Sequence, residues 1–428
     1  MGDPSRRGFI SVLAVLLSTG WAANHFASLI PVLRVDEGLS HTVLDGVFGI
    51  YALGLLPGLL TGGALSDRVG RAVVVLPGAL IASLGTLILL LWHDAPGLMV
   101  GRLVVGIGAG LAIGAGTAWA ADLRGKSGTV MAGVVLTSGF ALGPLFSGLL
   151  AQFAAFPLAT PFVVSAFLSV GSVTAAAVWS RTPVPVEAAT ITPVPDGAER
   201  SVANAPDGAE RSVANAPDGA ERSVANAPDG AERSVANALL WALPLAPWVF
   251  ASATVSFVTM TARLGDRYSG PLLPGFAAAL TLGAGILVQT AARHRNWGPQ
   301  AGTTGAALAA LGYCLVAVGG AHPALGLFIV CALVLGTAYG LCLREGLLDL
   351  ESLAPPASRG ALTGIFYVGT YLGFGLPVLL VVIEPTMGPS LPLVILAAVA
   401  AIVAVVRFRR LRSTQASTSH PRLEAASV

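Results

Sequence analysis

Twelve apolar stretches, each long enough to cross a lipid bilayer, follow one another along this 428-residue chain. Crossing the hydrocarbon core takes about 20 apolar residues, and backbone groups in lipid have no water partners, so each stretch must be helical. Only 11% of the residues are charged, against roughly 25% in an ordinary soluble domain. Most of the surface must therefore face lipid, and the sequence predicts an all-α membrane protein. The predicted spans are residues 9–33, 43–65, 72–92, 97–120, 129–151, 161–180, 239–261, 271–292, 301–320, 323–343, 361–383 and 388–406.

The basic residues predict the orientation, because Arg and Lys concentrate in cytoplasmic connections. With the first residues inside, the inner segments carry most of the arginines, and the outer ones carry Arg34, Arg263 and Arg267, each beside an acid. Both termini are therefore expected in the cytoplasm. Arg6 and Arg7 also resemble a twin-arginine export signal, but the apolar run that follows them continues to residue 33, longer than such a signal needs. An uncleaved first helix is expected.

The spans divide into two sets of six, with a segment of different composition between them. We predict a six-helix bundle over 1–180, a cytoplasmic linker over 181–238, a second six-helix bundle over 239–410 and a cytoplasmic tail over 411–428. The linker contains PDGAERSVANA four times in tandem. Pro-Asp-Gly in every copy breaks a helix, so the linker is expected to be flexible; the alternative is a docking segment for a partner.

The two halves align with each other at one nearly constant offset in the sequence. RVDEGLS (34–40) then matches RLGDRYS (263–269), GFALGP (139–144) matches GTYLGF (369–374), and RLVVGIGAG (102–110) matches ALVLGTAYG (332–340). Helices repeated in the same orientation form two bundles related by an axis along the membrane normal. Such a pair encloses a cavity at the midplane and can rock around it.

A charged turn, GGALSDRVGR (62–71), connects the second and third spans. Its residues match the Gly-x-Leu-x-Asp-Arg-x-Gly-Arg signature of the major facilitator superfamily, which the chain resembles over both halves: Gly63, Leu65, Asp67, Arg68, Gly70 and Arg71. The resemblance implies the major facilitator fold. It also implies that Asp67 caps the start of the eleventh helix, near residues 358–363, as a conformational latch. Alternatively, the two arginines only anchor the loop on the inner side.

Arg102 in the fourth span lies one to two turns inside the membrane, where a charge is costly unless it is paired or hydrated. Gly106 and Gly110 follow at a four-residue spacing that lets another helix approach closely. The resemblance is to the family's helix-4 motif, whose arginine is tied to proton coupling. A snorkelling interfacial arginine is the alternative; the second half has Ala332 in its place.

The fifth span contains GFALGPLFSG, with Gly139, Gly143 and Pro144. This looks like the Gly-x-x-x-Gly-Pro motif of the drug:proton antiporter branch, which ends in Gly-Gly where this chain has Ser147-Gly148. A close-packed, kinked helix at the interface between the bundles is compatible with the same residues.

Proton coupling requires a group that titrates. The first span offers His25, which changes charge near neutral pH, and Asp45 lies near the outer end of the second span. The alternatives are a hydrogen-bonded core histidine and a carboxylate that caps the helix start.

Other polar and aromatic residues receive weaker predictions. Asn24, Trp119, Tyr367 and Tyr371 are candidate cavity linings, with aromatic packing as the alternative for the rings. Three acids after the tenth span, Glu345, Asp349 and Glu351, are expected on a solvated inner loop. Cys314, Cys331 and Cys342 are expected to be buried apolar residues.

These features predict a secondary active transporter of a small molecule, and they favour a proton-coupled exporter of amphipathic compounds acting as an antiporter. The alternative is a proton-coupled or facilitative importer of a small metabolite. An enzyme is disfavoured, because the sequence has no metal-ligand spacing, nucleotide loop or nucleophile elbow. We expect a monomer in a bacterial cytoplasmic (inner) membrane, with protons and lipid as partners and without metal, cofactor or nucleic acid.

Overall fold

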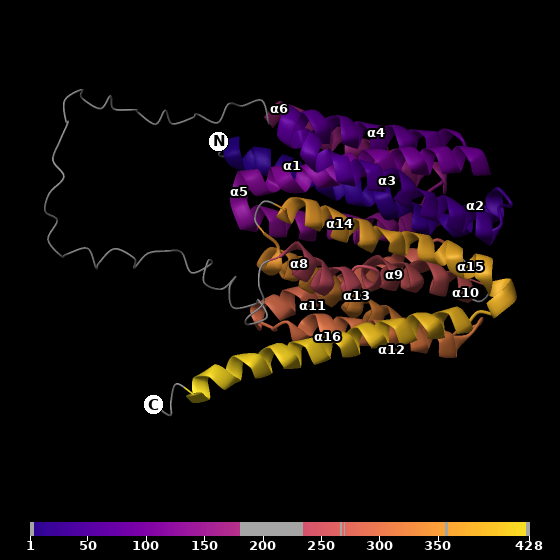
Figure 1. Cartoon of the computed structure of the whole chain (residues 1–428). Coiled ribbons are helices and arrows are strands. Elements are labelled where there is room, and N and C mark those ends of the chain that lie inside the picture. Colours follow the sequence, from indigo (N-terminus) through magenta and orange to yellow (C-terminus); the bar gives the residue numbers. More distant parts are fainter. Residues whose placement is uncertain (1–3, 180–233, 266–267, 269, 356–357, 425–428) are drawn as a thin grey trace, which may run out of the picture.

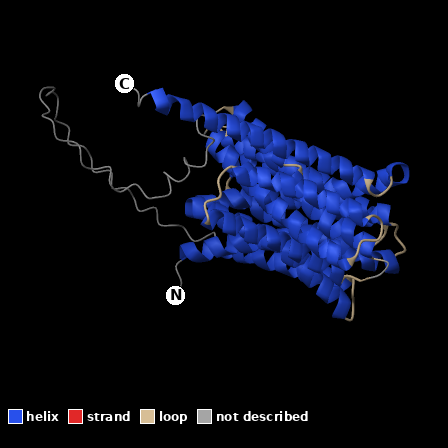
Figure 2. Cartoon of the chain, turned by 90° about the horizontal axis from the view of Figure 1, so that it is seen from below, coloured by secondary structure: helices blue, strands red, loops and turns tan. Residues whose placement is uncertain are grey.

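The structure is a computed structural model of the chain. It describes all residues except 1–3, 180–233, 266–267, 269, 356–357 and 425–428. Most of the predicted linker, with its repeats up to residue 233, lies outside the described residues. The described part of the chain is helical with short connecting loops and contains no strand (Figure 2).

Twelve helical segments in the described residues are long and apolar enough to cross a membrane, which confirms the predicted all-α membrane fold. The helical elements of the first half are α1 Pro4–Asn24, η1 His25–Leu29, α2 Ile30–Asp36, α3 His41–Val69, α4 Arg71–Leu91, α5 Ala95–Phe153 and α6 Ala159–Trp179. Those of the second half are α8 Val235–Ala242, η2 Leu243–Leu245, α9 Trp248–Thr254, η3 Val255–Thr259, α10 Met260–Leu264, α11 Leu272–His294, α12 Gln300–Gly319, α13 Leu325–Leu353, α14 Arg359–Tyr371, η4 Leu372–Gly375, α15 Leu376–Met387 and α16 Leu391–Glu424.

Several of these elements combine into one span or divide into two. α1, η1 and α2 make the first span, α8 to α10 the seventh, and α14 to α15 the eleventh. α5 holds the fourth and fifth spans, which meet where the backbone is non-helical at Arg124 and Gly125. Gly125 has a φ of 55°, which favours glycine at this reversal. Cys331 and Cys342 are buried as predicted, but Cys314 is exposed on the surface of the bundle, because it lies on the outer side of α12.

The first and second sets of six helices lie side by side along parallel axes (Figure 1). α1 begins and α16 ends at the same end of the molecule, which we call the termini end; the other is the far end. α3 packs against α14 and α15, and α5 packs against α11, so the two bundles meet along two seams. This matches the six-plus-six arrangement expected from the sequence.

The internal duplication is visible in the helix contacts. A Cβ atom added to Gly106 would collide with the backbone oxygen of Tyr51, and one added to Gly336 would collide with that of Thr281. Gly336 and Thr281 lie at the same sequence offset from Gly106 and Tyr51, respectively, as the one that aligns the two halves. The same offset relates the backbone contact of Gly110 with Leu55 to that of Gly340 with Gly285. It also relates the contact of Gly143 with Trp21 to that of Gly373 with Ala251. Small residues therefore let the backbones touch at equivalent places in both bundles.

The breaks in the first and seventh spans are also equivalent. η1 is a 3-10 turn over His25–Leu29, and η3 is a π turn over Val255–Thr259, which the same offset places on each other. Non-α turns within a helix often mark functional sites or hinges. Each half thus interrupts its first helix at the same position.

Gly336 gives a direct test of the close contact. Gly336→Ala is expected to lower the free energy of unfolding by about 1–3 kcal/mol, because the added methyl group must displace backbone. Gly283→Ala on the facing α11 is the matched control, since nothing lies within 4 Å of its added Cβ. SDS titration of the purified variants in mixed micelles measures both. Equal stability of the two variants would contradict the contact.

Candidate functional site

The charged turn between α3 and α4 is held together within the first half. α3 ends at Val69, and Gly70 turns the chain with a φ of 99° before α4 begins at Arg71. Arg71 pairs with Asp67 through Nη1 at 2.5 Å and with Asp122 through Nε at 2.7 Å. The sequence did not identify Asp122, on the fourth span, as a partner of Arg71, because sequence alone does not show which helix end faces this turn.

The described bonds of Asp67 therefore tie it to Arg71 in its own bundle, and its side chain is largely exposed. Gly63 lies in the last part of α3, and Arg68 is exposed in its last turn. α14, whose start Asp67 is predicted to cap, packs beside α3. The latch across the two bundles stays a prediction.

Arg102 is fully buried and has no carboxylate partner among the described ion pairs. Its Nη1 donates to the backbone carbonyl of Ala23 at 2.7 Å and its Nη2 to that of Phe48 at 3.3 Å. A change from α-helical to 3-10 bonding leaves carbonyls without their usual donors, and Ala23 lies just before η1. The broken first helix thus supplies an acceptor for the buried cation.

Three aromatic rings surround the same guanidinium group. Its central carbon lies 4.6 Å from the ring centroid of Tyr51, 5.2 Å from that of Phe26 and 5.6 Å from that of Phe48. Ring faces attract a cation most when water is excluded. Arg102 is therefore held by rings and carbonyls from the first and second spans, and it does not snorkel to the surface.

His25 is buried at the start of η1, within electrostatic range of Arg102. Its Nδ1 lies 3.2 Å from the carbonyl oxygen of Trp21 and 3.1 Å from that of Ala22. Carbonyl oxygens only accept, so Nδ1 carries the proton. Nε2 has no hydrogen-bond partner in the described structure, which leaves one buried ring nitrogen available to bind a proton.

Asp45 is buried in the second turn of α3. It does not cap this helix, because the cap is Ser40, whose hydroxyl accepts from the backbone nitrogen of Val43. The structure therefore contradicts the alternative that Asp45 caps the start of this helix.

An aromatic cluster joins the two bundles. Phe250 lies 4.7 Å from Tyr371 and 4.8 Å from Phe374 between ring centroids, while Phe374 lies 5.5 Å from Phe48 and 5.7 Å from Tyr51. Further members are Phe140, Phe257, Tyr339 and Tyr367. Because Phe48 and Tyr51 also surround Arg102, the buried cation adjoins this cluster.

The four predicted cavity residues separate into two groups. Tyr367 and Tyr371 belong to the aromatic cluster, and Asn24 donates to the carbonyl of the cluster residue Phe140 at 2.8 Å. Trp119 instead packs among apolar side chains inside the first bundle, around Val75 and Leu16. The predicted packing glycines, Gly139 and Gly143, contact the first helix near Leu17 and Trp21.

A cavity of about 440 Å³ lies between the bundles toward the far end. The first half contributes η1, α2 and the end of α5, and the second half contributes η3, α10 and the start of α11. Its lining is mostly apolar and includes Ala27 and Phe257, which the offset between the halves places on each other. Phe257 also contacts Phe48 at 6.3 Å between ring centroids, so the aromatic cluster adjoins the wall of this cavity. Next to the cavity, Ser28 donates to the carbonyl oxygen of Pro144, and Gly275 on α11 packs against the same carbonyl group.

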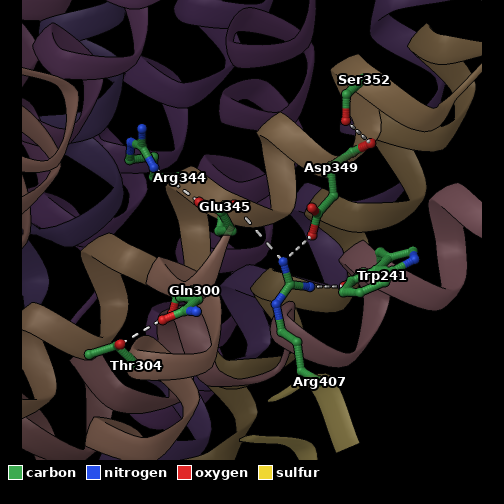
Figure 3. A network of polar contacts seen from close by, with 8 residues as sticks. All are labelled: Trp241, Gln300, Thr304, Arg344, Glu345, Asp349, Ser352 and Arg407. Carbon is green, nitrogen blue, oxygen red and sulfur yellow. Dashed lines mark hydrogen bonds and ion pairs between the residues drawn. The ribbon is translucent and has the colours of Figure 1, made fainter. Parts of the chain in front are cut away.

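The second bundle contains a buried charge network that contradicts one prediction (Figure 3). Glu345 and Asp349 were expected on a solvated loop, but α13 continues to Leu353 and both side chains are buried. Nη2 of Arg407, on α16, lies 2.8 Å from Oδ2 of Asp349 and 4.0 Å from Oε1 of Glu345. The contact with Asp349 is an ion pair whose atoms are not aligned as a hydrogen bond. Glu351 is half-buried in the same helix.

Two further contacts complete this network. Arg344 donates to Oε2 of Glu345 at 3.0 Å, and Nη1 of Arg407 donates to the carbonyl oxygen of Trp241 at 2.8 Å. The negative charges of two carboxylates are therefore compensated by the positive charges of two guanidinium groups within the bundle. Among the described residues, no group of three His, Cys, Asp or Glu side chains is placed to hold a metal ion.

The sequence profile of the Major Facilitator Superfamily matches residues 10–378 of the chain. The chain belongs to the major facilitator superfamily. Its fold agrees with solved members: a POT family transporter in complex with 5-aminolevulinic acid superposes with a TM-score of 0.71 at 14% identity, covering 95% of this chain and 96% of that one. The POT family transporter PepTSo gives 0.70 at 14% identity, covering 97% and 99%. These likenesses show the major facilitator fold.

Curated relatives within this superfamily match over shorter stretches. The multidrug resistance protein MdtL of Klebsiella pneumoniae is 35% identical over 81 residues, 19% of this chain and 21% of MdtL. The quinolone resistance protein NorA of Staphylococcus aureus is 27% identical over 129 residues, 29% of this chain and 33% of NorA. The matches thus span about a fifth to a third of these relatives.

Proposed function

We propose that this superfamily member exports amphipathic small molecules from a bacterial cell in exchange for protons. The observation that carries this proposal is the cavity between the bundles, whose lining is mostly apolar and whose wall adjoins the aromatic cluster at Phe257. Aromatic faces bind apolar and cationic groups. The printed names of the two relatives, a multidrug and a quinolone resistance protein, support the same substrate class.

Alternating access would use the two broken helices. η1 and η3 border the same cavity from opposite bundles, and the glycine contacts keep each bundle rigid. Rocking of the bundles about the aromatic cluster would close the far end and open the termini end. With the termini in the cytoplasm, the cavity described here opens outward, and Asp67 would latch the inner side.

Protons would be exchanged at buried ionisable groups. Arg102 and His25 lie together at the break in the first span, and Asp45 is buried in the second. The network of Glu345 and Asp349 adds two buried carboxylates. We assign coupling to Arg102 and His25, because Arg102 lies against the cluster rings Phe48 and Tyr51 and His25 lies within electrostatic range of Arg102. Asp45 supplies a buried carboxylate on α3.

Efflux of ethidium, an aromatic cation, from proteoliposomes with an imposed pH gradient tests the proposal. The gradient, acidic on the side that receives ethidium, is expected to drive transport. Phe257→Ala is expected to raise KM about 2- to 10-fold, the worth of one aromatic contact. Phe153→Ala is the control, because that ring is exposed on the surface.

Two results would contradict export by exchange. Transport in the same direction as the proton gradient would indicate an importer, and an unchanged KM in Phe257→Ala would remove the cavity from the substrate path. A small polar metabolite transported in place of ethidium would support the importer as well.

A further inference from the structure

A second hollow, outside the transport pathway, lies on the surface of the C-terminal bundle. It is a groove of about 170 Å³ between α8 and η2 on one side and α16 on the other. Leu240, Trp241, Pro244, Ile402, Val403, Val406, Arg407 and Arg410 line it. We call it the α8–α16 groove. Both of its helices have their termini-end turns here, since α8 begins the seventh span and α16 completes the twelfth.

The groove changes from apolar to basic along its length. Its body is formed by aliphatic side chains, of which Leu240 is 51% and Ile402 61% exposed. Its end is formed by two arginines whose guanidinium groups donate to backbone carbonyls of α8: Arg407 to Trp241 at 2.8 Å and Arg410 to Leu240 at 3.1 Å. The rise from Ile402 to Arg410 is about 12 Å along a helix.

Four arginines gather at the basic end of the groove. Arg409 and Arg412 are exposed next to Arg407 and Arg410 in the last turns of the span. The nearby carboxylates, Glu345 and Asp349, are buried on the inner side of Arg407 and pair with it and with Arg344. No acidic residue lines the groove among the described residues, while Arg407 and Arg410 line its basic end.

We propose that the α8–α16 groove binds one anionic phospholipid, with an acyl chain along Ile402 and Val406 and the phosphate at Arg409 and Arg410. Two observations select this occupant. The walls are exposed apolar side chains on helices long and apolar enough to span a membrane, and the basic end lies in the last turns of the twelfth span. Basic pockets at the ends of transmembrane helices bind acidic headgroups.

Native mass spectrometry of the purified full chain tests this binding. The protein is mixed with equal amounts of phosphatidylglycerol and phosphatidylcholine of the same acyl chains, and retained lipid is counted. The wild type is expected to retain phosphatidylglycerol in preference. Arg409→Gln with Arg410→Gln is expected to reduce that retention by roughly 10- to 30-fold, since each arginine near a headgroup contributes about fivefold.

Two further variants separate the groove from general attraction. Arg293→Gln with Arg295→Gln removes the same charge from exposed positions at the end of α11, outside the groove, and is expected to leave retention unchanged. Val406→Trp fills the apolar body without changing charge and is expected to displace the lipid. Thermal unfolding midpoints show that each variant is folded.

Three outcomes would overturn the proposal. Equal retention of both lipids by the wild type removes the headgroup preference. Equal loss in the α11 control shows a diffuse surface potential. Displacement of phosphatidylglycerol by excess inorganic phosphate, with retention insensitive to Val406→Trp, shows a site for a free anion. None of these readouts depends on transport, so the proposed export function is tested separately.

Discussion

Arg407→Met is expected to lower the free energy of unfolding by about 3–5 kcal/mol, because removal of one partner leaves buried carboxylates uncompensated. Asp349 is 1% exposed and its described ion pair is with Arg407. Arg407 also donates to the carbonyl of Trp241, so the seventh span loses one of its described hydrogen bonds to the twelfth and keeps the one from Arg410 to Leu240. SDS titration of the purified protein measures the change.

The double variant Arg407→Met with Asp349→Leu separates charge from packing. It removes both members of the 2.8 Å pair and leaves Glu345 with Arg344. An apolar replacement of a whole buried pair is often nearly neutral, so the double variant is expected to be more stable than Arg407→Met alone. Arg409→Met, exposed on the same helix, is the control. A double variant that loses the sum of both single losses would contradict this account.

The same network shows where reading the sequence fails. Hydropathy predicted the twelve spans, because lipid burial requires long apolar runs. It ended the tenth span at residue 343, since Arg344, Glu345 and Asp349 follow. Yet α13 continues to Leu353, because these charges neutralise one another and Arg407. That partner lies on α16, two spans further along the chain, and single-helix hydropathy carries no information on such pairs.

The duplicated glycines were predictable for a different reason. A backbone contact tolerates only glycine or another small residue, so it leaves a mark at a fixed spacing that both halves preserve, as at Gly106 and Gly336. The helix break at His25 leaves no such mark, because its 3-10 turn has no glycine or proline within His25–Leu29. The sequence therefore predicted that Arg102 needs partners, but not that a broken helix supplies them.

Arg102→Ala is expected to reduce transport driven by a pH gradient at least about tenfold. The carbonyls of Ala23 and Phe48 would lose their charged donor, and hydrogen bonds to charged groups contribute about 1.5–3 kcal/mol each. Proteoliposomes measure gradient-driven ethidium efflux, and the exchange of ethidium at equal pH on both sides measures substrate movement without coupling.

The comparison of these two rates separates coupling from structure. If Arg102 acts with His25 in proton coupling, the alanine variant loses gradient-driven efflux but keeps exchange, because the cavity at Phe257 is intact. Arg102→Lys keeps the charge but not the planar fork that reaches two carbonyls, and it is expected to recover part of the coupling. Arg295→Ala, exposed at the end of α11, is the control and should match the wild type. Loss of exchange and efflux together, with a lowered thermal midpoint, would make Arg102 a structural residue. Unchanged efflux would show that Arg102 has no part in coupling and that the three rings around its guanidinium group only pack against it.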